Sequence, residues 1–147
     1  MEIIDSHDFN IFEVKRSTKE NELITVTTYL LHKHNIFFNL AIKMETFFNF
    51  ANQVQSGYNN ITYHNKTHAS DLAATAYFIM TKGGFRDKGK LDDIDFASMI
   101  IGGACHDLGH FGVTNPYLVE ARHEFAIRYN DVSVLENHHV ASSFAIM

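Results

Sequence analysis

Apolar residues recur at helical spacing through the first third of the chain, and this periodicity restricts the fold more than any other feature. The spacing outweighs the β-branched run from Ile24 to Thr28 and predicts two helices before residue 57, followed by a turn at residues 56–60. The apolar positions are Leu23, Val26, Leu30, Leu31, Ile36, Phe37, Leu40, Ala41, Met44, Phe47, Phe48 and Ala51. We therefore expect an all-α fold, a multi-helix bundle.

The rest of the chain continues this pattern. A third helix is expected to carry His64 and His68 and to run to about Met80, and a fourth to run from about Ile94 into Asp107, with Asp92 or Asp93 as its cap. The segment between them, residues 82–90, is glycine-rich and charged, and without a following Lys-Ser/Thr it is interpreted as a solvated connection.

A last helix is expected from about Val134 to Met147, with an Asp or Ser cap in residues 130–133. Val140, Phe144 and Met147 are still apolar near its end, and no Gly, Asn, Lys or Arg closes it. We therefore expect the fold to be truncated at its C-terminus, so that the chain forms part of one domain.

Bulk composition excludes several classes of function. The net charge is -5 and there is no Lys/Arg cluster, which argues against nucleic acid as the main partner. No stretch approaches the roughly 18 apolar residues of a membrane segment. Cys105 is the single cysteine and lies in an apolar run, so we expect a buried thiol and an intracellular, cytoplasmic location.

Two clusters of metal-ligating residue types carry the functional signal. His64, His68 and Asp71 fall at i, i+4 and i+7, which places them on one face if the segment is helical. His106 and Asp107 are adjacent, and burying their charge at the end of an apolar helix without a cation would be costly. Either cluster alone is nearly as consistent with a polar surface. Together they indicate a metal-dependent phosphoester hydrolase.

The residues that could bind a metal ion directly are His68, His106, Asp107 and either His64 or His110, because imidazole nitrogens and a carboxylate suit Zn, Mn or Fe. Asp107 is the natural bridge to a second, harder ion such as Mg or Mn. Glu136 is a candidate to orient a ligand histidine or a metal-bound water, although residues 136–140 fit the exposed face of the last helix equally well.

Three motifs in this order resemble the catalytic domain of class I 3′,5′-cyclic nucleotide phosphodiesterases, a branch of the HD hydrolase superfamily. They are Tyr63-His64-Asn65 with His68 and Asp71, then residues 106–115, then Tyr129-Asn130-Asp131 with residues 133–139. The similarity runs from about Phe9 to the last residue.

The resemblance implies an all-α domain that holds zinc and a second ion, usually magnesium, and that cleaves the 3′ ester of cyclic AMP or cyclic GMP. It implies that His68, His106 and Asp107 are zinc ligands, and that Asp107 also contacts the second ion. It further implies that His64 is the general acid, a role that suits an imidazole near neutral pH. His110 and Glu136 would contact the metal waters, and Tyr63 would line the substrate pocket.

Family domains are much longer than this chain, which would therefore be the N-terminal portion, residues 1–147, of one catalytic domain. A further aspartate ligand and the purine-binding residues would belong to the missing C-terminal half, so we expect the fragment alone to bind metal weakly and turn over little. Two alternatives stay open. One is another HD-superfamily phosphohydrolase, and the other is a truncated, non-catalytic chain that binds a partner through exposed apolar surface.

Overall fold

The computed structural model describes residues 2–6 and 8–147, and within them it contains helices and no strands. The expected all-α class is confirmed. A short 3-10 helix, η1 (Glu2–Asp5), is followed by α1 (Ile11–Ser17), α2 (Glu22–Lys33), α3 (Ile36–Asn39), α4 (Met44–Gly57), α5 (Lys66–Thr81), α6 (Phe85–Gly89), α7 (Asp93–Cys105), α8 (Asn115–Glu120), α9 (Glu124–Arg128) and α10 (Val134–Ile146). None of the described helices is long and apolar enough to cross a membrane.

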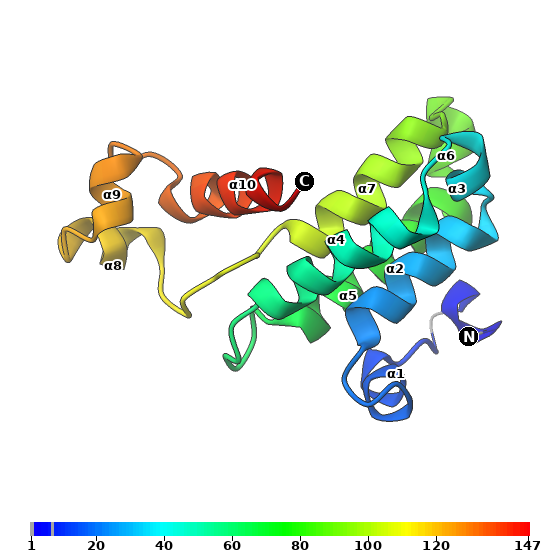
Figure 1. The fold of residues 1–147 in the computed structure, drawn as a ribbon, viewed down its shortest axis with the longest axis horizontal. Helices are drawn as coiled ribbons and strands as arrows, with labels where there is room; N and C mark the ends of the chain where they lie inside the picture. The colour runs from blue at the N-terminus through cyan, green and yellow to red at the C-terminus, as the bar shows by residue number, and fades with distance from the viewer. Residues whose placement is uncertain (1, 7) are drawn as a thin grey trace.

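Helices α2, α4, α5 and α7 pack side by side and form the body of the molecule (Figure 1). Their core includes Leu30, Tyr77, Phe96 and Ile100, each at most 2% exposed. These positions lie on the apolar faces that helical spacing gives to α2, α5 and α7. Burial of these faces, rather than the intrinsic preference of single residues, therefore holds the bundle together.

Helices α5 and α7 approach each other closely at a pair of small residues. A Cβ atom built on Gly103 would lie 3.3 Å from the Cα atom of Ala73, so a larger residue there would press the two backbones slightly apart. Ala69 and Ala104 are also buried in this region, next to Leu108. The contact lies one turn before the C-terminal end of α7, where the polar residues gather.

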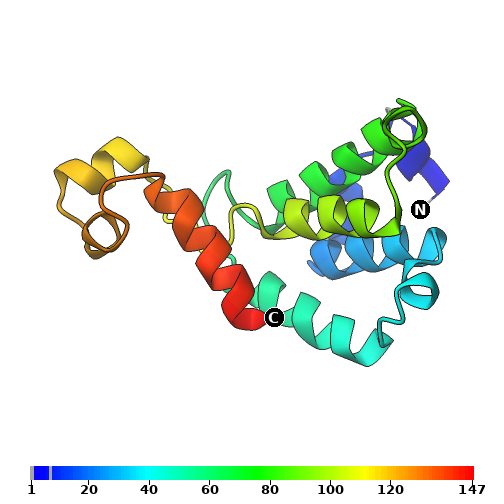
Figure 2. The same ribbon diagram turned by 90° about the horizontal axis from the view of Figure 1, so that it is seen from above.

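Beyond α7 the chain leaves the bundle. Helices α8, α9 and the first half of α10 extend to one side, and α10 returns so that its C-terminal end lies beside α4 (Figures 1 and 2). This arm has its own small core of Leu118, Ala126, Val134 and Leu135. Helix α10 therefore joins the arm to the bundle.

Several helix boundaries differ from expectation. The prediction of two helices before residue 57 is wrong, because this part of the chain forms four α-helices, α1 to α4. The Asn65 side chain accepts the N–H groups of Thr67 and His68, so α5 begins at Lys66 and His64 lies before it. The predicted shared helical face of His64, His68 and Asp71 is therefore wrong. An additional short helix, α6, occupies most of the expected solvated connection.

The caps of the later helices were predicted with mixed success. Asp92 caps α7 in a capping box with Asp95, as expected. The cap residue of α10 is Ser133, as expected, but it has a positive φ of 42° and its side chain makes no capping hydrogen bond. Helices α8 and α9 are too short to have been recognised from periodicity.

Candidate metal centre

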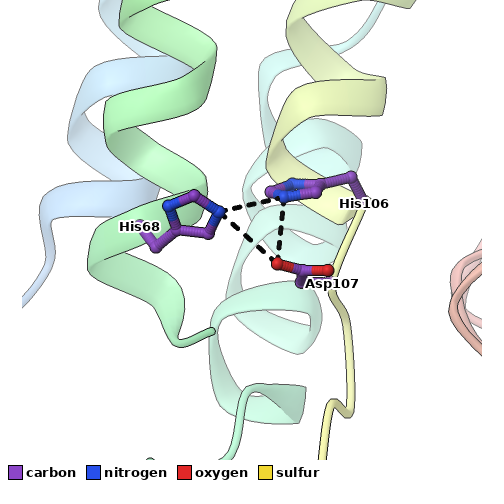
Figure 3. Close-up of side chains that lie close together, drawn as sticks. All are labelled: His68, His106 and Asp107. Atoms are coloured by element: carbon purple, nitrogen blue, oxygen red, sulfur yellow. Dashed lines mark hydrogen bonds and ion pairs between the residues drawn. The ribbon is translucent and has the colours of Figure 1, made fainter. Parts of the chain in front are cut away.

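Three side chains converge where the N-terminal end of α5 meets the C-terminal end of α7 (Figure 3). Nε2 of His106 lies 3.2 Å from Nε2 of His68 and 3.0 Å from Oδ2 of Asp107. The same carboxylate oxygen lies 3.5 Å from Nε2 of His68. Three ligand atoms at these separations can all reach one small cation at the roughly 2.0–2.2 Å bond lengths of zinc.

The hydrogen bonds of the imidazoles suit a cation. Nδ1 of His106 lies 2.8 Å from the carbonyl oxygen of Gly103, to which it donates, so in the neutral ring its Nε2 carries the lone pair. Burial, followed by the electrostatic effect of His106, holds the pKa of His68 below its usual value and favours the neutral ring. Two facing imidazole nitrogens and a carboxylate form a donor set for a divalent metal ion.

The turn after α7 brings Asp107 into this position. His106 is the C-cap residue of α7, and the N–H groups of Leu108 and His110 then donate to the carbonyls of Cys105 and Asp107. Gly109 completes the turn with a φ of +75°, a conformation that side chains with a Cβ rarely adopt. The predicted end of this helix in Asp107 is thus correct to within two residues.

His139 joins the site from α10, and the sequence analysis missed it. Its side chain is buried, its Nδ1 lies 2.7 Å from the carbonyl oxygen of Leu108, and its Nε2 lies 3.8 Å from Oδ1 of Asp107. Ligand atoms of Asp107, His110 and His139 form a second group that could hold an ion. The available signal was the i, i+4 spacing of Leu135 and His139, which places this histidine on the buried face of α10.

His110 and His64 stack on each other beside the candidate ligand residues. Their ring centroids are 4.1 Å apart and the planes are nearly parallel at 12°. Nδ1 of His110 accepts the N–H of Gly112 at 2.9 Å, so in the neutral ring its Nε2 carries the proton. Burial keeps the pKa of His110 below its usual value and favours this neutral ring.

The other candidates lie around this centre. Glu136 is exposed at the start of α10, and its Oε2 accepts a hydrogen bond from Nδ2 of Asn115 at 2.9 Å; this bond lowers the pKa of Glu136. Tyr63 is 63% exposed, and its ring centroid lies 4.6 Å from that of His68. Asp71 is exposed and lies outside both ligand groups, while burial raises the pKa of the Cys105 thiol to about 11.

An apolar cavity of about 390 Å³ opens between α7 and α10, next to two of the site histidines. It is lined by Leu40, Ile94, Ala97, Ser98, Ile101, Gly102, Cys105, His106, His139, Val140, Ser143, Phe144 and Met147. Val140 and Phe144 of α10 are strongly exposed, at 57% and 70%, and so is Met147 directly after the helix, at 66%. A patch of this kind beside a polar centre is typical of a surface that another polypeptide segment or a ligand covers.

Comparisons with known proteins agree on one family. The sequence model described as 3'5'-cyclic nucleotide phosphodiesterase matches residues 63–147. Over 143 residues the chain is 34% identical to the 3',5'-cyclic-AMP phosphodiesterase 4 of Dictyostelium discoideum, covering 95% of this chain and 13% of that protein. It is 33% identical to the dual specificity calcium/calmodulin-dependent 3',5'-cyclic nucleotide phosphodiesterase 1B of Bos taurus, covering 98% of this chain and 27% of that protein.

A solved structure supports the same relationship. The fold matches the phosphodiesterase domain of the RhoPDE fusion protein from the choanoflagellate Salpingoeca rosetta with a TM-score of 0.84 and 28% identity. The match covers 97% of this chain and 43% of that one. The chain thus spans less than half of each of these relatives.

Proposed function

The chain belongs to the 3′,5′-cyclic nucleotide phosphodiesterase family, and we propose that it contributes the metal-binding part of an enzyme that hydrolyses cyclic AMP or cyclic GMP to the 5′ monophosphate. Such a reaction would end a cyclic nucleotide signal. The observation that carries the proposal is the convergence of His68, His106 and Asp107, whose ligand atoms lie within 3.5 Å of one another. Residues 1–147 would form the N-terminal part of a single catalytic domain.

The donor set fits the divalent ions that we propose, zinc together with magnesium or manganese. His68, His106 and Oδ2 of Asp107 would hold the zinc, and Oδ1 of Asp107 faces the other way, toward His139, and is available to the second ion. When bound, such ions lower the pKa of water and offset negative charge on a phosphoryl oxygen.

Hydrolysis of the cyclic ester requires a proton on the departing O3′ when its bond to phosphorus breaks. We assign this proton to His64, because its imidazole lies outside α5 and stacks on His110 at the border of the metal centre. Nε2 of His110 would donate a hydrogen bond to the attacking water, and the carboxylate of Glu136 would accept one. Tyr63 would form part of the substrate pocket beside His68.

The apolar cavity between α7 and α10 supports the view that further polypeptide completes the domain. Alone, this chain is expected to turn over little, since it supplies one carboxylate to the three-residue ligand group. The same exposed apolar surface favours the second candidate function, a non-catalytic chain that binds a partner through this face. The lone buried thiol of Cys105 supports our proposal of an intracellular, cytoplasmic location.

The proposal is tested with a longer gene product that contains this chain. Incubation with cyclic AMP or cyclic GMP and Mg²⁺ should yield the 5′ monophosphate, measured by chromatography. His64→Ala should lower kcat by about 10²–10⁴-fold, the usual contribution of general acid catalysis. His32→Ala, which changes an exposed histidine of α2, is the matched control and should retain activity. Absence of turnover, or equal activity of the two variants, would refute the assignment.

A further inference from the structure

Glu22 is a buried carboxyl group outside the metal centre. It lies in the first turn of α2 and its side chain is fully buried. Its Oε1 accepts a hydrogen bond of 2.7 Å from the hydroxyl of Thr67, and its Oε2 has no hydrogen-bond partner among the described residues. Polar groups buried at this depth are uncommon and require an explanation.

The position of Thr67 suggests an explanation for the buried carboxyl group. It lies in the first turn of α5, directly before His68, and is itself buried. Glu22 and Thr67 are 45 residues apart in sequence, so their hydrogen bond ties the start of α2 to the start of α5. The carboxyl group therefore lies close to the N-terminal ends of both helices.

The position of the His68 side chain depends on the backbone in the first turn of α5, whereas the His106 side chain has an additional anchor. Nδ1 of His106 is fixed by the carbonyl of Gly103, the usual arrangement for a histidine that ligates a metal. Among residues 2–6 and 8–147, no group forms a hydrogen bond with Nδ1 of His68. The position of its ring is therefore set by the backbone of α5 and by packing against the rings of Tyr63, His64 and His106.

We propose that Glu22 and Thr67 are positioning residues for His68. Their hydrogen bond holds the first turn of α5 against α2, and in this way it keeps Nε2 of His68 within ligand distance of His106 and Asp107. The inference rests on the proposed metal site and assigns to a residue of α2 a role in metal affinity.

The test measures zinc affinity of the longer gene product that contains this chain by competition with a chromophoric chelator, together with thermal unfolding of each metal-free variant. Thr67→Val removes the hydroxyl while keeping the shape of the side chain, and Glu22→Ala removes the acceptor. Glu22→Gln keeps an acceptor oxygen for Thr67. Thr27→Val is the matched control, because Thr27 is also buried but donates to the carbonyl of Leu23 within α2.

Thr67→Val and Glu22→Ala are expected to weaken zinc binding by about 10-fold or more, the effect usual for groups that orient a metal ligand. Glu22→Gln should stay within about threefold of the wild type. The positioning role is wrong if Thr67→Val binds zinc as the wild type does, or if Thr27→Val weakens binding equally. If His68→Ala binds zinc as tightly as the wild type, the proposed metal site itself fails.

Discussion

Replacement of His139 by phenylalanine tests how α10 holds the turn that follows α7. The imidazole is 3% exposed and donates to the carbonyl oxygen of Leu108, which is in turn 1% exposed. Phenylalanine keeps a ring in this position and removes the donor, so the main consequence is a buried carbonyl without a partner. Such a group costs about 1–3 kcal/mol, and we expect a loss of about 2 kcal/mol in the free energy of unfolding.

For a chain of this length, a loss of that size lowers Tm by about 4–8 °C. The assay is thermal unfolding followed by circular dichroism, with urea unfolding as a second measurement. His138→Phe is the matched control, because this neighbouring ring stacks on Phe111 and Phe125 and forms no side-chain hydrogen bond within the described structure. The reasoning is refuted if His139→Phe is no less stable than His138→Phe.

Three further predictions concern the turn, the metal and pH. Gly109→Ala should lower the free energy of unfolding in urea by about 1–3 kcal/mol, because the φ of Gly109 is positive and a Cβ there would lie 2.9 Å from Nε2 of His138. The control is Gly102→Ala, which should not destabilise the chain because the space around Gly102 is open. Equal stability of the two variants contradicts this account. Asp107→Asn should weaken zinc binding by more than about 100-fold in chelator competition, and a smaller change argues against direct ligation. Burial keeps the pKa of His34 in the folded chain below its value in the unfolded chain. Below about pH 6.5 the unfolded chain therefore binds a proton that the folded chain does not, and the free energy of unfolding should fall from pH 7 to pH 5. A urea midpoint that is unchanged over this range would contradict the prediction.

The sequence allowed good prediction of the long helices and of the residues that meet between α5 and α7. Helical spacing identifies α5 and α7 because each buries one continuous face, and His68 and the His106-Asp107 pair lie at their ends. The start of α5 was misjudged because apolar periodicity carries no information on which polar side chain caps a helix. At Asn65 the side-chain oxygen bonds two N–H groups and excludes His64 from the helix.

Contacts between residues that are far apart in the chain could not be predicted from the sequence. Thr67 and Glu22 are ordinary polar residues in the sequence, and only the packing of α2 on α5 brings them together. His139 was overlooked for a similar reason, since its partner, the carbonyl of Leu108, is a backbone atom that no sequence pattern marks. Both contacts depend on tertiary structure rather than on local preference.

The close approach of Gly103 and Ala73 has a consequence for the candidate metal centre. The backbones of α5 and α7 meet there, one turn before His106. Well-packed interiors deform little, so this contact helps to fix the separation of the two helices that carry His68 and His106. A larger residue at position 103 would press on Ala73 and shift α5, together with His68, away from α7.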